Sequence, residues 1–465
     1  MIKDLFATSG FSLPKHPTEL RLQRNSTRRI GLLSGNLVTN ADAVVSGASA
    51  RVCDRGVYGF ASIADMSESG VAKVLLAAAE NAQFLGQRAA NNLGEMPPLA
   101  PCHEPLVKQA PEIPQRTLLD FVRVIDNHIA TSYTNLSGRS VGANCLDTEK
   151  LLYSTDGEAV PVAFSHSLVP RANIVISLTI NDSSGAPVSL SKSYGGYGFF
   201  NELFTSPDDL YGQIAILYEK LLHKSEGVHA EAGTHLCVIG SEVSGILAHE
   251  AVGHTVESDL VLGGSVAGNL MNEQVASELV TLVDFAHTCR GLTTPVPVIV
   301  DDEGIKASDA ILIENGVLRS YMHNRLNALK MGHSPQGNAR ADIFSDEPLI
   351  RMRNTAILPG KSQLEDLIAS VDKGYYLVRS SNGQADTTSE FMFGIAEGYE
   401  ITNGRIGQAI RDTTISGVAF DMLKTVDMIS SDMTWGSSGW CGKKQTITVG
   451  MGGPALRCRI NIGGR

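Results

Sequence analysis

The feature that most constrains this chain is the spacing of two histidines, His249 and His254, in the segment SEVSGILAHEAVGHTVESD. Val243, Ile246 and Leu247 form an apolar stripe in the same segment, which predicts an amphipathic helix. A regular helix turns by about 100° per residue, so side chains five positions apart diverge by about 140° and cannot reach one metal ion. One extra residue looped into the helix, a π-bulge, would return both imidazoles to the same side. The sequence therefore predicts a distorted metal-binding helix.

Two further residues of this segment, Gly253 and Glu250, bear on its chemistry. Gly253 directly precedes the second histidine, and we expect the distortion there because glycine is conformationally permissive. Glu250 follows the first histidine and could reach a water activated by the ion without itself binding the ion. It would then act as the general base that takes a proton from the water and returns it to the leaving amine. The alternative is that Glu250 and both histidines are ordinary packed or solvent-facing residues of an amphipathic helix.

A zinc ion in a catalytic site needs a third protein ligand, which can come from far along the sequence. Cys441 lies in the glycine-bounded segment SSGWCGKK, where a thiolate could approach the ion and where Lys443 and Lys444 would favour the thiolate form. Glu257 could bind the ion or orient the imidazole of His254 through a hydrogen bond. The residues alone leave the choice open. The other candidates with a suitable donor atom are Cys458, His287, His323 and His333.

The composition is that of an ordinary globular protein that does not bind nucleic acid directly. Hydrophobic residues make up 43% of the 465 residues and charged residues 19%, which is enough to build two or three domain cores. The net charge of -11 disfavours contact with a phosphate backbone. The short basic clusters at 21–29 (RLQRNSTRR) and 441–445 (CGKKQ) are interpreted as solvated surface.

The sequence also predicts a cytoplasmic protein without membrane contact. No apolar run approaches the ~20 residues needed to span a bilayer, and the N-terminal segment lacks the basic and apolar regions of a signal peptide. The seven cysteines are scattered without a C-x-x-C pair, which is typical of a reducing compartment. We expect most of them to be small buried hydrophobic residues.

The hydrophobic patterns predict an α+β fold with two domains, residues 1–228 and 229–465. The N-terminal domain is expected to be an α/β sandwich-like domain with an antiparallel sheet and long helices. Its predicted elements are a hairpin turning at Arg55-Gly56, a helix over 67–94 ending at Gly94, helices over 116–133 and 208–224, and the sheet over 135–200.

The C-terminal domain is expected to be rich in strands and to carry the distorted metal-binding helix. Two Asn-Gly pairs between apolar alternations predict tight hairpins, at Asn315-Gly316 and at Asn403-Gly404. The other predicted elements are a strand over 234–240, a helix over 361–374 with a Ser362/Glu365 capping box and Gly374 as its stop, a helix over 417–433, and final strands over 445–464.

Seven segments resemble, in order, the successive signatures of a known family, TldD/PmbA, also called modulators of DNA gyrase. The resemblance extends over nearly the whole chain. The segments are RVCDRGVYGFASIADMS, AHEAVGHTVESD, VDDEG, IENGVLRSYMHNR, PLIRMRNTAILPG, EFMFGIAEGYEITNGRIG and SSGWCGKKQTITVGMGGPALR.

The resemblance implies a zinc-dependent peptidase that cuts unfolded or extended peptides. It makes His249, His254 and Cys441 the ligands of one zinc ion per chain and Glu250 the general base. Because the metal motif is complete, the chain is similar to the metal-bearing TldD-like branch, which pairs with a TldE/PmbA-like branch that lacks the motif. A dimer is therefore expected, either a homodimer or a heterodimer with such a homologue.

Two other functions remain as alternatives. The chain could be a catalytically silent scaffold subunit that pairs with an active homologue to form a peptide-binding chamber, but its complete set of candidate ligands disfavours this. Direct DNA binding is disfavoured by the charge. For a peptidase, we expect an extended peptide to pair with a sheet edge near the Asn-Gly hairpins, at the junction with a second subunit.

Overall fold

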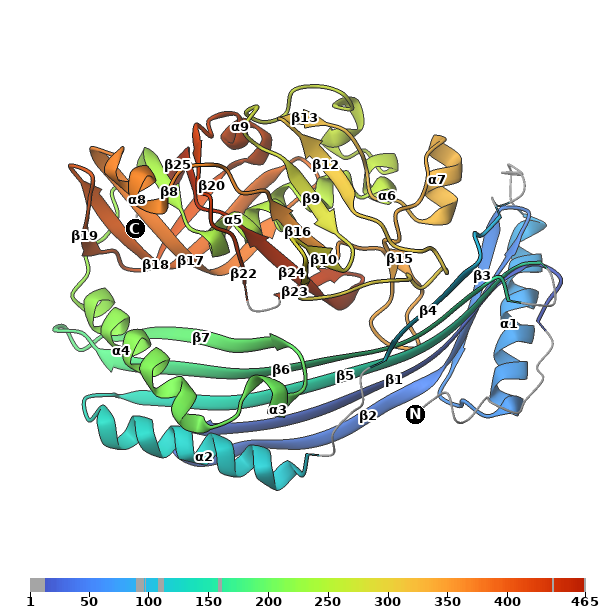
Figure 1. Cartoon of the computed structure of the whole chain (residues 1–465), viewed down its shortest axis with the longest axis horizontal. Coiled ribbons are helices and arrows are strands. Elements are labelled where there is room, and N and C mark those ends of the chain that lie inside the picture. The colour runs from blue at the N-terminus through green and yellow to red at the C-terminus, as the bar shows by residue number, and fades with distance from the viewer. Residues whose placement is uncertain are drawn as a thin grey trace.

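The computed structural model describes residues 13–88, 96, 98–107, 113–157, 161–436 and 439–463. The fold is α+β, as the sequence predicts. A long curved sheet from the N-terminal half lies beneath a C-terminal half that is built on two further sheets (Figure 1). The two halves face each other across the concave side of the long sheet.

The N-terminal sheet has seven strands in the order β3-β2-β1-β5-β6-β4, with β7 also paired to β6. All its pairings are antiparallel except that of β4 with β6. The predicted turn at Arg55-Gly56 is confirmed, with φ angles of 51° and 74°. The strands are β1 (Pro17–Leu33), β2 (Asn36–Asp54), β3 (Val57–Ile63), β4 (Cys102–Val107), β5 (Gly138–Asp156), β6 (Ala163–Asn181) and β7 (Pro187–Tyr197).

Helices cover one face of this sheet. Even-numbered residues of β1 and β6 point to that face, as the alternation of a strand requires. Leu20 and Leu22 pack in one apolar cluster with the first helix, and Ile174 and Ile176 in a second cluster with the next two long helices. The helices are α1 (Glu68–Gly86), α2 (Gln115–Ser132), the short α3 (Phe200–Leu203) and α4 (Tyr211–Ser225).

The predicted end of the first helix at Gly94 is wrong, because α1 ends at Gly86. Gly94 itself lies outside the described residues. Gly86 is close to the β2–β3 turn, since a Cβ there would lie 3.0 Å from Oδ2 of Asp54. Glycine is also a weak helix former, so the helix stops where this close contact is made.

The first C-terminal sheet closes on itself. Its order is β17-β8-β25-β20-β18, and β18 pairs back to β17, while β19 extends from β18 and β21 from β25. The strands are β8 (Gly233–Ile239), β17 (Lys373–Ala385), β18 (Glu390–Thr402), β19 (Arg405–Ala409), β20 (Thr413–Val418), β21 (Met428–Ile429) and β25 (Leu456–Gly463).

The second C-terminal sheet is open, in the order β13-β12-β9-β16-β24-β22, with β23 paired to β24. Its strands are β9 (Leu282–Phe285), β12 (Ala310–Glu314), β13 (Val317–Leu318), β16 (Asn354–Ile357), β22 (Thr434–Trp435), β23 (Gly439–Lys443) and β24 (Gln445–Gly453). The remaining pairs are β10 (Thr288–Cys289) with β11 (Leu292–Thr293), and β14 (Ala339–Arg340) with β15 (Leu349–Ile350). The helices of this half are α5 (Ser241–Ile246), α6 (Ser258–Leu262), α7 (Arg325–Met331), α8 (Leu364–Ala369) and α9 (Ala419–Lys424).

Both predicted Asn-Gly hairpins are confirmed. Asn315 and Gly316 join β12 to β13 with φ angles of 48° and 82°. Asn403 and Gly404 join β18 to β19 with φ angles of 49° and 71°. Positive φ at both central positions is the geometry that gives Asn-Gly its preference for tight hairpins.

Two predicted helices of the C-terminal half are corrected. The capping box of α8 is formed by Gln363 and Asp366 rather than by Ser362 and Glu365. Gly374 is not its stop but part of β17, where a Cβ would lie 1.9 Å from the carbonyl oxygen of Leu236.

The helix predicted over 417–433 is only α9, six residues long. Val418 still belongs to β20, and Met428 starts β21. The apolar period continues past both ends of α9, but pairing with β18 takes Val418 into one strand and pairing with β25 takes Met428 into another.

The second face of the N-terminal sheet is polar and packs against the C-terminal half. Arg21 is 3% exposed and donates to the carbonyl oxygens of Phe344 (3.3 Å) and Asp346 (2.6 Å). Arg51 pairs with Glu303 of the other half. The interpretation of 21–29 as solvated surface is therefore wrong for Arg21, because odd-numbered residues of β1 face the C-terminal half rather than water.

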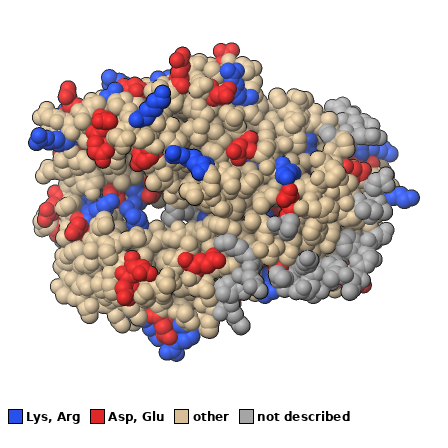
Figure 2. Space-filling model, in the orientation of Figure 1, with Lys and Arg blue, Asp and Glu red and all other residues tan. Residues whose placement is uncertain are grey.

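A second set of contacts joins the two halves at the other end of the sheet. Nζ of Lys224 lies 2.7 Å from Oδ1 of Asp412, and Nη1 of Arg411 lies 2.6 Å from Oδ2 of Asp182. Between the two halves the surface is hollowed, and basic side chains stand on the rim (Figure 2). The residues between Ser225 and Gly233 link α4 to β8. We propose that the boundary between the two domains lies in this link, at the predicted position 228/229.

A buried ion pair holds β9 and β16 together and gives the first prediction. Arg353 and Asp284 are both fully buried and lie 2.8 Å apart, and Arg353 also donates to the carbonyl oxygens of Ser308 (2.9 Å) and Gln336 (2.8 Å). Arg353→Leu would leave Asp284 charged and unpaired, so urea denaturation should show a loss of about 3–5 kcal/mol in the free energy of unfolding.

The matched control is Arg319→Leu. Its partner Glu314 lies 3.6 Å away and both side chains are about half exposed (45% and 51%). This variant should stay within about 0.5 kcal/mol of the parent. Equal losses in the two variants would contradict the importance assigned to the buried pair.

Candidate metal centre

The helix that carries the two histidines changes its winding where they lie. Helix α5 continues into a π-helical segment, Leu247–Gly253, and then into a 3-10 turn, His254–Val256. Hydrogen bonds of a π-helix span five residues, so side chains five apart come onto one side. The ring centroids of His249 and His254 lie 5.4 Å apart with an interplanar angle of 80°. The predicted distortion of the helix is confirmed.

Gly253 serves the site in a different way from the one expected. Its φ and ψ of -53° and -47° are ordinary helical values that any residue adopts. Glycine is needed because a Cβ at this position would lie 2.0 Å from Sδ of Met352. The requirement is therefore close packing beneath His254, not conformational freedom.

Cys441 approaches the two histidines from β23. Its Sγ lies 3.2 Å from Nε2 of His254. Within the described part of the chain, His249, His254 and Cys441 form the one group of three or more metal-binding side chains, and their ligand atoms lie within 4.8 Å of one another. Of the candidates for the third ligand, the structure brings Cys441 to the histidines.

The other candidates lie elsewhere or contact the site indirectly. Cys458 is in β25, where its backbone lies opposite that of Cys237 in the neighbouring strand β8. His323 stacks on His333 with ring centroids 5.1 Å apart. His287 lies outside the group of three as well.

His249 provides the strongest sign that the site holds a ligand. The side chain is fully buried, and neither ring nitrogen has a hydrogen-bond partner. Buried polar atoms are nearly always satisfied, so this pair of orphaned nitrogens calls for an unseen partner. Burial, the neighbouring His254 and two arginines, Arg351 and Arg340, hold the pKa of His249 well below its usual range, so the ring is neutral, the form that binds metal.

Glu257 orients the imidazole of His254 through a hydrogen bond to Nδ1. Its Oε2 lies 3.0 Å from Nδ1 of His254 and 3.1 Å from Nζ of Lys443. This leaves Nε2 of His254 directed toward Cys441. Of the two roles open to Glu257, the geometry fits the orienting one. Lys443, expected from the sequence to favour the thiolate, instead donates to Asp259 (2.8 Å).

The electrostatic surroundings of His254 favour a positive charge. Burial lowers the pKa of His254, but hydrogen bonds to Cys441 and Glu257 outweigh burial and raise it to about 10. Burial tends to raise the pKa of Glu257, while His254 and Lys443 together hold it below its usual range. A cation placed among these groups would meet the same favourable field, and two imidazoles with one thiolate are a donor set suited to zinc.

Glu250 stands at the solvent side of the group. Its Oε2 lies 3.5 Å from Nε2 of His254, and its side chain is 21% exposed. Partial burial raises the pKa of Glu250, with the charge on His254 acting in the opposite direction. A carboxylate in this position can meet both water and a ligand held by the three donors.

Arg351 is a supporting residue that the sequence alone did not reveal. It is fully buried and donates to the carbonyl oxygens of Cys441 (2.7 Å) and Gln445 (2.9 Å), which fixes the β23–β24 turn. Arg351 and Arg353 alternate with apolar residues. This alternation is typical of a strand that directs both arginines to one face, and it was the signal available in the sequence. Three of their partners, Asp284, Cys441 and Gln445, lie 69 to 94 positions away in sequence and could not be inferred from it.

Profiles of known families match two parts of the chain. The profile described as the PmbA/TldA metallopeptidase C-terminal domain matches residues 232–464, and the one described as PmbA/TldA metallopeptidase domain 1 matches residues 18–82. The chain belongs to the PmbA/TldD family of metallopeptidases. The family and the class of enzyme that the sequence predicts are thereby confirmed.

Curated relatives agree with this assignment. A metalloprotease TldD homolog of Buchnera aphidicola (subsp. Schizaphis graminum) is 35% identical over 358 residues, 74% of this chain and 70% of the relative. A metalloprotease of Methanothermobacter thermautotrophicus is 34% identical over 339 residues, 72% of each chain. A zinc metalloprotease TldD homolog of Saccharolobus solfataricus is 35% identical over 258 residues, 55% of this chain and 57% of the relative.

Solved structures share the fold at low sequence identity. TldE from Thermococcus kodakarensis superposes with a TM-score of 0.73 at 17% identity, covering 96% of this chain and 97% of that one. A protein described as a modulator of a DNA gyrase from Thermotoga maritima gives 0.76 at 19% identity, covering 96% of both chains. Among the described residues, no helix has the length and apolar character needed to cross a membrane.

Removal of the thiol tests the ligand group. Cys441→Ala should lower the zinc content of the purified protein from near-stoichiometric to a small fraction, because two imidazoles alone leave the ion short of protein ligands. Elemental analysis after dialysis measures the effect. Cys289→Ala is the matched control, since Cys289 is also a free buried cysteine but lies outside the ligand group. Full zinc retention by Cys441→Ala would show that the third ligand is another residue.

Overpacking beneath His254 tests the role of Gly253. Gly253→Ala should weaken zinc binding, because the new methyl group would collide with Met352 and shift the helix. Met352→Ala in the same chain should recover most of the lost affinity, measured by competition with a chelating dye. Unchanged affinity in Gly253→Ala, or no recovery in the double variant, would contradict the close-packing explanation.

Proposed function

We propose that this chain is a zinc-dependent peptidase that hydrolyses peptide bonds of unfolded or extended peptides. His249, His254 and Cys441 would hold one zinc ion, and Glu250 would be the general base. The observation that carries the proposal is the convergence of the ligand atoms of His249, His254 and Cys441 to within 4.8 Å, together with the two unpartnered nitrogens of His249. The name of the Saccharolobus solfataricus relative, a zinc metalloprotease, supports the choice of metal.

In this proposal, the residues around the ligands hold the ligand side chains in position. When bound, zinc supplies a Lewis acid for the hydrolytic step. Glu257 and Lys443 hold the ring of His254 so that Nε2 faces the site, and Arg351 holds the backbone of Cys441. Such outer contacts fix the orientation of ligands and support their affinity.

Glu250 would perform the proton transfers. Its carboxylate takes a proton from the attacking water and then gives it to the nitrogen of the leaving amine, as the peptide C–N bond breaks. A raised pKa suits this role, because a carboxylate closer to neutrality both accepts and returns a proton readily. Its partial exposure keeps it in reach of solvent water.

The Asn-Gly hairpins support binding of an extended peptide. The strand that follows Asn403-Gly404, β19, stands at the end of its sheet, whereas β13 is hydrogen-bonded on its outer side to residues 272–276. A strand at a sheet edge presents unpaired backbone groups to which an extended peptide can add, with little dependence on its side chains. We place the substrate beside the edge of β19, at a junction with a second subunit.

A dimer and a cytoplasmic location complete the proposal. The structural similarity to TldE supports either a homodimer or a heterodimer with a TldE/PmbA-like homologue. All seven cysteines are free and buried, which supports a reducing compartment. The alternative, a catalytically silent scaffold, would not require the orphaned nitrogens of His249 to meet a metal.

Glu250→Gln separates metal binding from catalysis. The amide keeps the shape of the side chain but cannot accept the proton, so the variant should keep its zinc and lose peptide cleavage by a factor of roughly 100 or more. Mass spectrometry of an unfolded polypeptide, incubated with the parent, the variant, and the parent plus chelator, measures the products.

Glu226→Gln offers the control, since this residue caps the C-terminal end of α4 and lies outside the ligand group. It should cleave like the parent. A parent that binds zinc yet gives no products in any condition would favour the scaffold. Cleavage by Glu250→Gln at the parental rate would remove this residue from the mechanism.

A further inference from the structure

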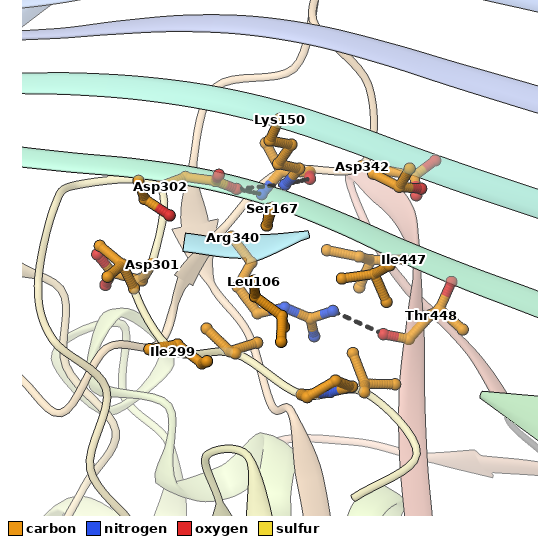
Figure 3. Close-up of a pocket in the computed structure, with 18 of the residues that line it drawn as sticks. Leu106, Lys150, Ser167, Ile299, Asp301, Asp302, Arg340, Asp342, Ile447 and Thr448 are labelled. Carbon is orange, nitrogen blue, oxygen red and sulfur yellow. Dashed lines mark hydrogen bonds and ion pairs between the residues drawn. The ribbon is translucent and has the colours of Figure 1, made fainter. Parts of the chain in front are cut away.

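A second polar site lies between the two halves of the molecule. A cavity of about 100 Å³ is lined on one side by β4, β5 and β6 and on the other by the C-terminal half (Figure 3). The odd-numbered residues of β6 face this cavity, because the even-numbered ones lie under the helices.

Arg171 of β6 lines this cavity with an incompletely bonded guanidinium. The residue is 6% exposed. Its Nη1 makes one long contact of 3.4 Å to the carbonyl oxygen of Pro295, and its Nη2 is buried without a hydrogen-bond partner. No carboxylate among the described residues forms an ion pair with it. Arg171 also lines a neighbouring pocket with Trp440, beside Cys441 in β23.

Arg340 approaches the same cavity from the C-terminal half. It is 7% exposed and donates only to backbone carbonyl oxygens, those of Met352 and Thr448 (2.8 Å for the latter) (Figure 3). Burial and the positive charge of Arg340 together lower the pKa of Arg171 to about 9. Two buried cations therefore repel each other here without an anion between them.

Two of the three acidic residues that line the cavity, Asp301 and Asp302, are already engaged, and the third, Asp342, forms no ion pair with Arg171 or Arg340 among the described residues. Asp302 lies 2.7 Å from Lys150 and 3.5 Å from Arg21. Asp301 accepts hydrogen bonds from backbone amides, among them those of Glu303 (3.0 Å) and Ile305 (2.9 Å). Isolated buried charges are costly unless a partner neutralises them, so the pair of arginines calls for an anion from outside the chain.

The cavity adjoins the ligand group through β24. Ile447 and Thr448 line the cavity, and in the β23–β24 pair Ile447 is directly opposite Cys441. Met352, which accepts a hydrogen bond from Arg340, packs against Gly253 beneath His254. A peptide that reaches the three donors therefore has this cavity next to it.

We propose that Arg171 and Arg340 form a carboxylate-binding subsite for the peptide substrate. The carboxylate is either the C-terminal α-carboxylate of the peptide or an Asp or Glu side chain, and the planar guanidinium groups suit both. This inference rests on the proposed peptidase function, since it names a chemical feature of the peptide that the same enzyme selects.

The test measures peptide binding separately from cleavage. Zinc-loaded Glu250→Gln protein is titrated by calorimetry with an unfolded peptide that ends in a free carboxylate and with the same peptide ending in an amide. A second pair exchanges one internal Glu for Gln. The carboxylate form of one pair should bind more tightly by roughly 10- to 150-fold, the range expected for hydrogen bonds to a charged group. Which pair responds identifies the source of the carboxylate.

Arg171→Met in the same background should abolish this preference and leave the affinity for the neutral peptide unchanged. Arg116→Met is the matched control, because Arg116 is 75% exposed on α2 and pairs with Asp120. It should preserve the preference. Thermal unfolding without peptide adds a second readout, since removal of an unpaired buried charge should leave the melting temperature of Arg171→Met at or above that of the parent.

Three results would overturn the subsite. Equal affinity for the charged and neutral members of both peptide pairs would show that no carboxylate is recognised. A much lower melting temperature for Arg171→Met would show that the arginine is a structural contact. Stabilisation of the parent by inorganic phosphate but not by a free-acid peptide would assign another anion.

If the parent cleaves peptides while any of these three results holds, the subsite alone fails. If Arg171-dependent binding is seen without any cleavage, the peptidase function fails instead.

Discussion

The site depends on one local departure from regular helix geometry. The π-helical segment Leu247–Gly253 brings His249 and His254 to one side of a helix that would otherwise separate them. That segment is held in place by its packing, with Gly253 against Met352 and the apolar residues around it in the largest core cluster of the chain. A distortion of this kind persists only where its surroundings fix it, and here the surroundings are two sheets of the C-terminal half.

Buried charge is used in two contrasting ways around this site. Arg351 and Arg353 are fully buried, and each is anchored by hydrogen bonds to the backbone or to a carboxylate, so they act as internal clamps on β16 and the β23–β24 turn. Arg171 and Arg340 lie in the cavity between the halves, without a carboxylate partner among the described residues. The first pair accounts for the rigidity of the ligand frame, and the second marks the place where something from outside the chain would bind.

Much of this arrangement could be predicted from local patterns, and several of the failures share one cause. The spacing of His249 and His254 predicts the π-helical segment, and the Asn-Gly pairs predict both hairpins, because these features depend on residues close in sequence. Cys441 could be named as a candidate but not placed by spacing alone, since its position depends on pairing with β24. Two of the misjudged features, Arg21 as surface and Gly374 as a helix stop, are positions where a distant segment covers or pairs with the residue.

X-ray absorption at the zinc edge of the metal-loaded protein tests the central claim most directly, because it reports the ligand atoms themselves. The account predicts one sulfur at about 2.3 Å and a remaining shell of nitrogen or oxygen at about 2.0–2.1 Å. A spectrum with no sulfur neighbour, or with several, would contradict a centre built from His249, His254 and Cys441.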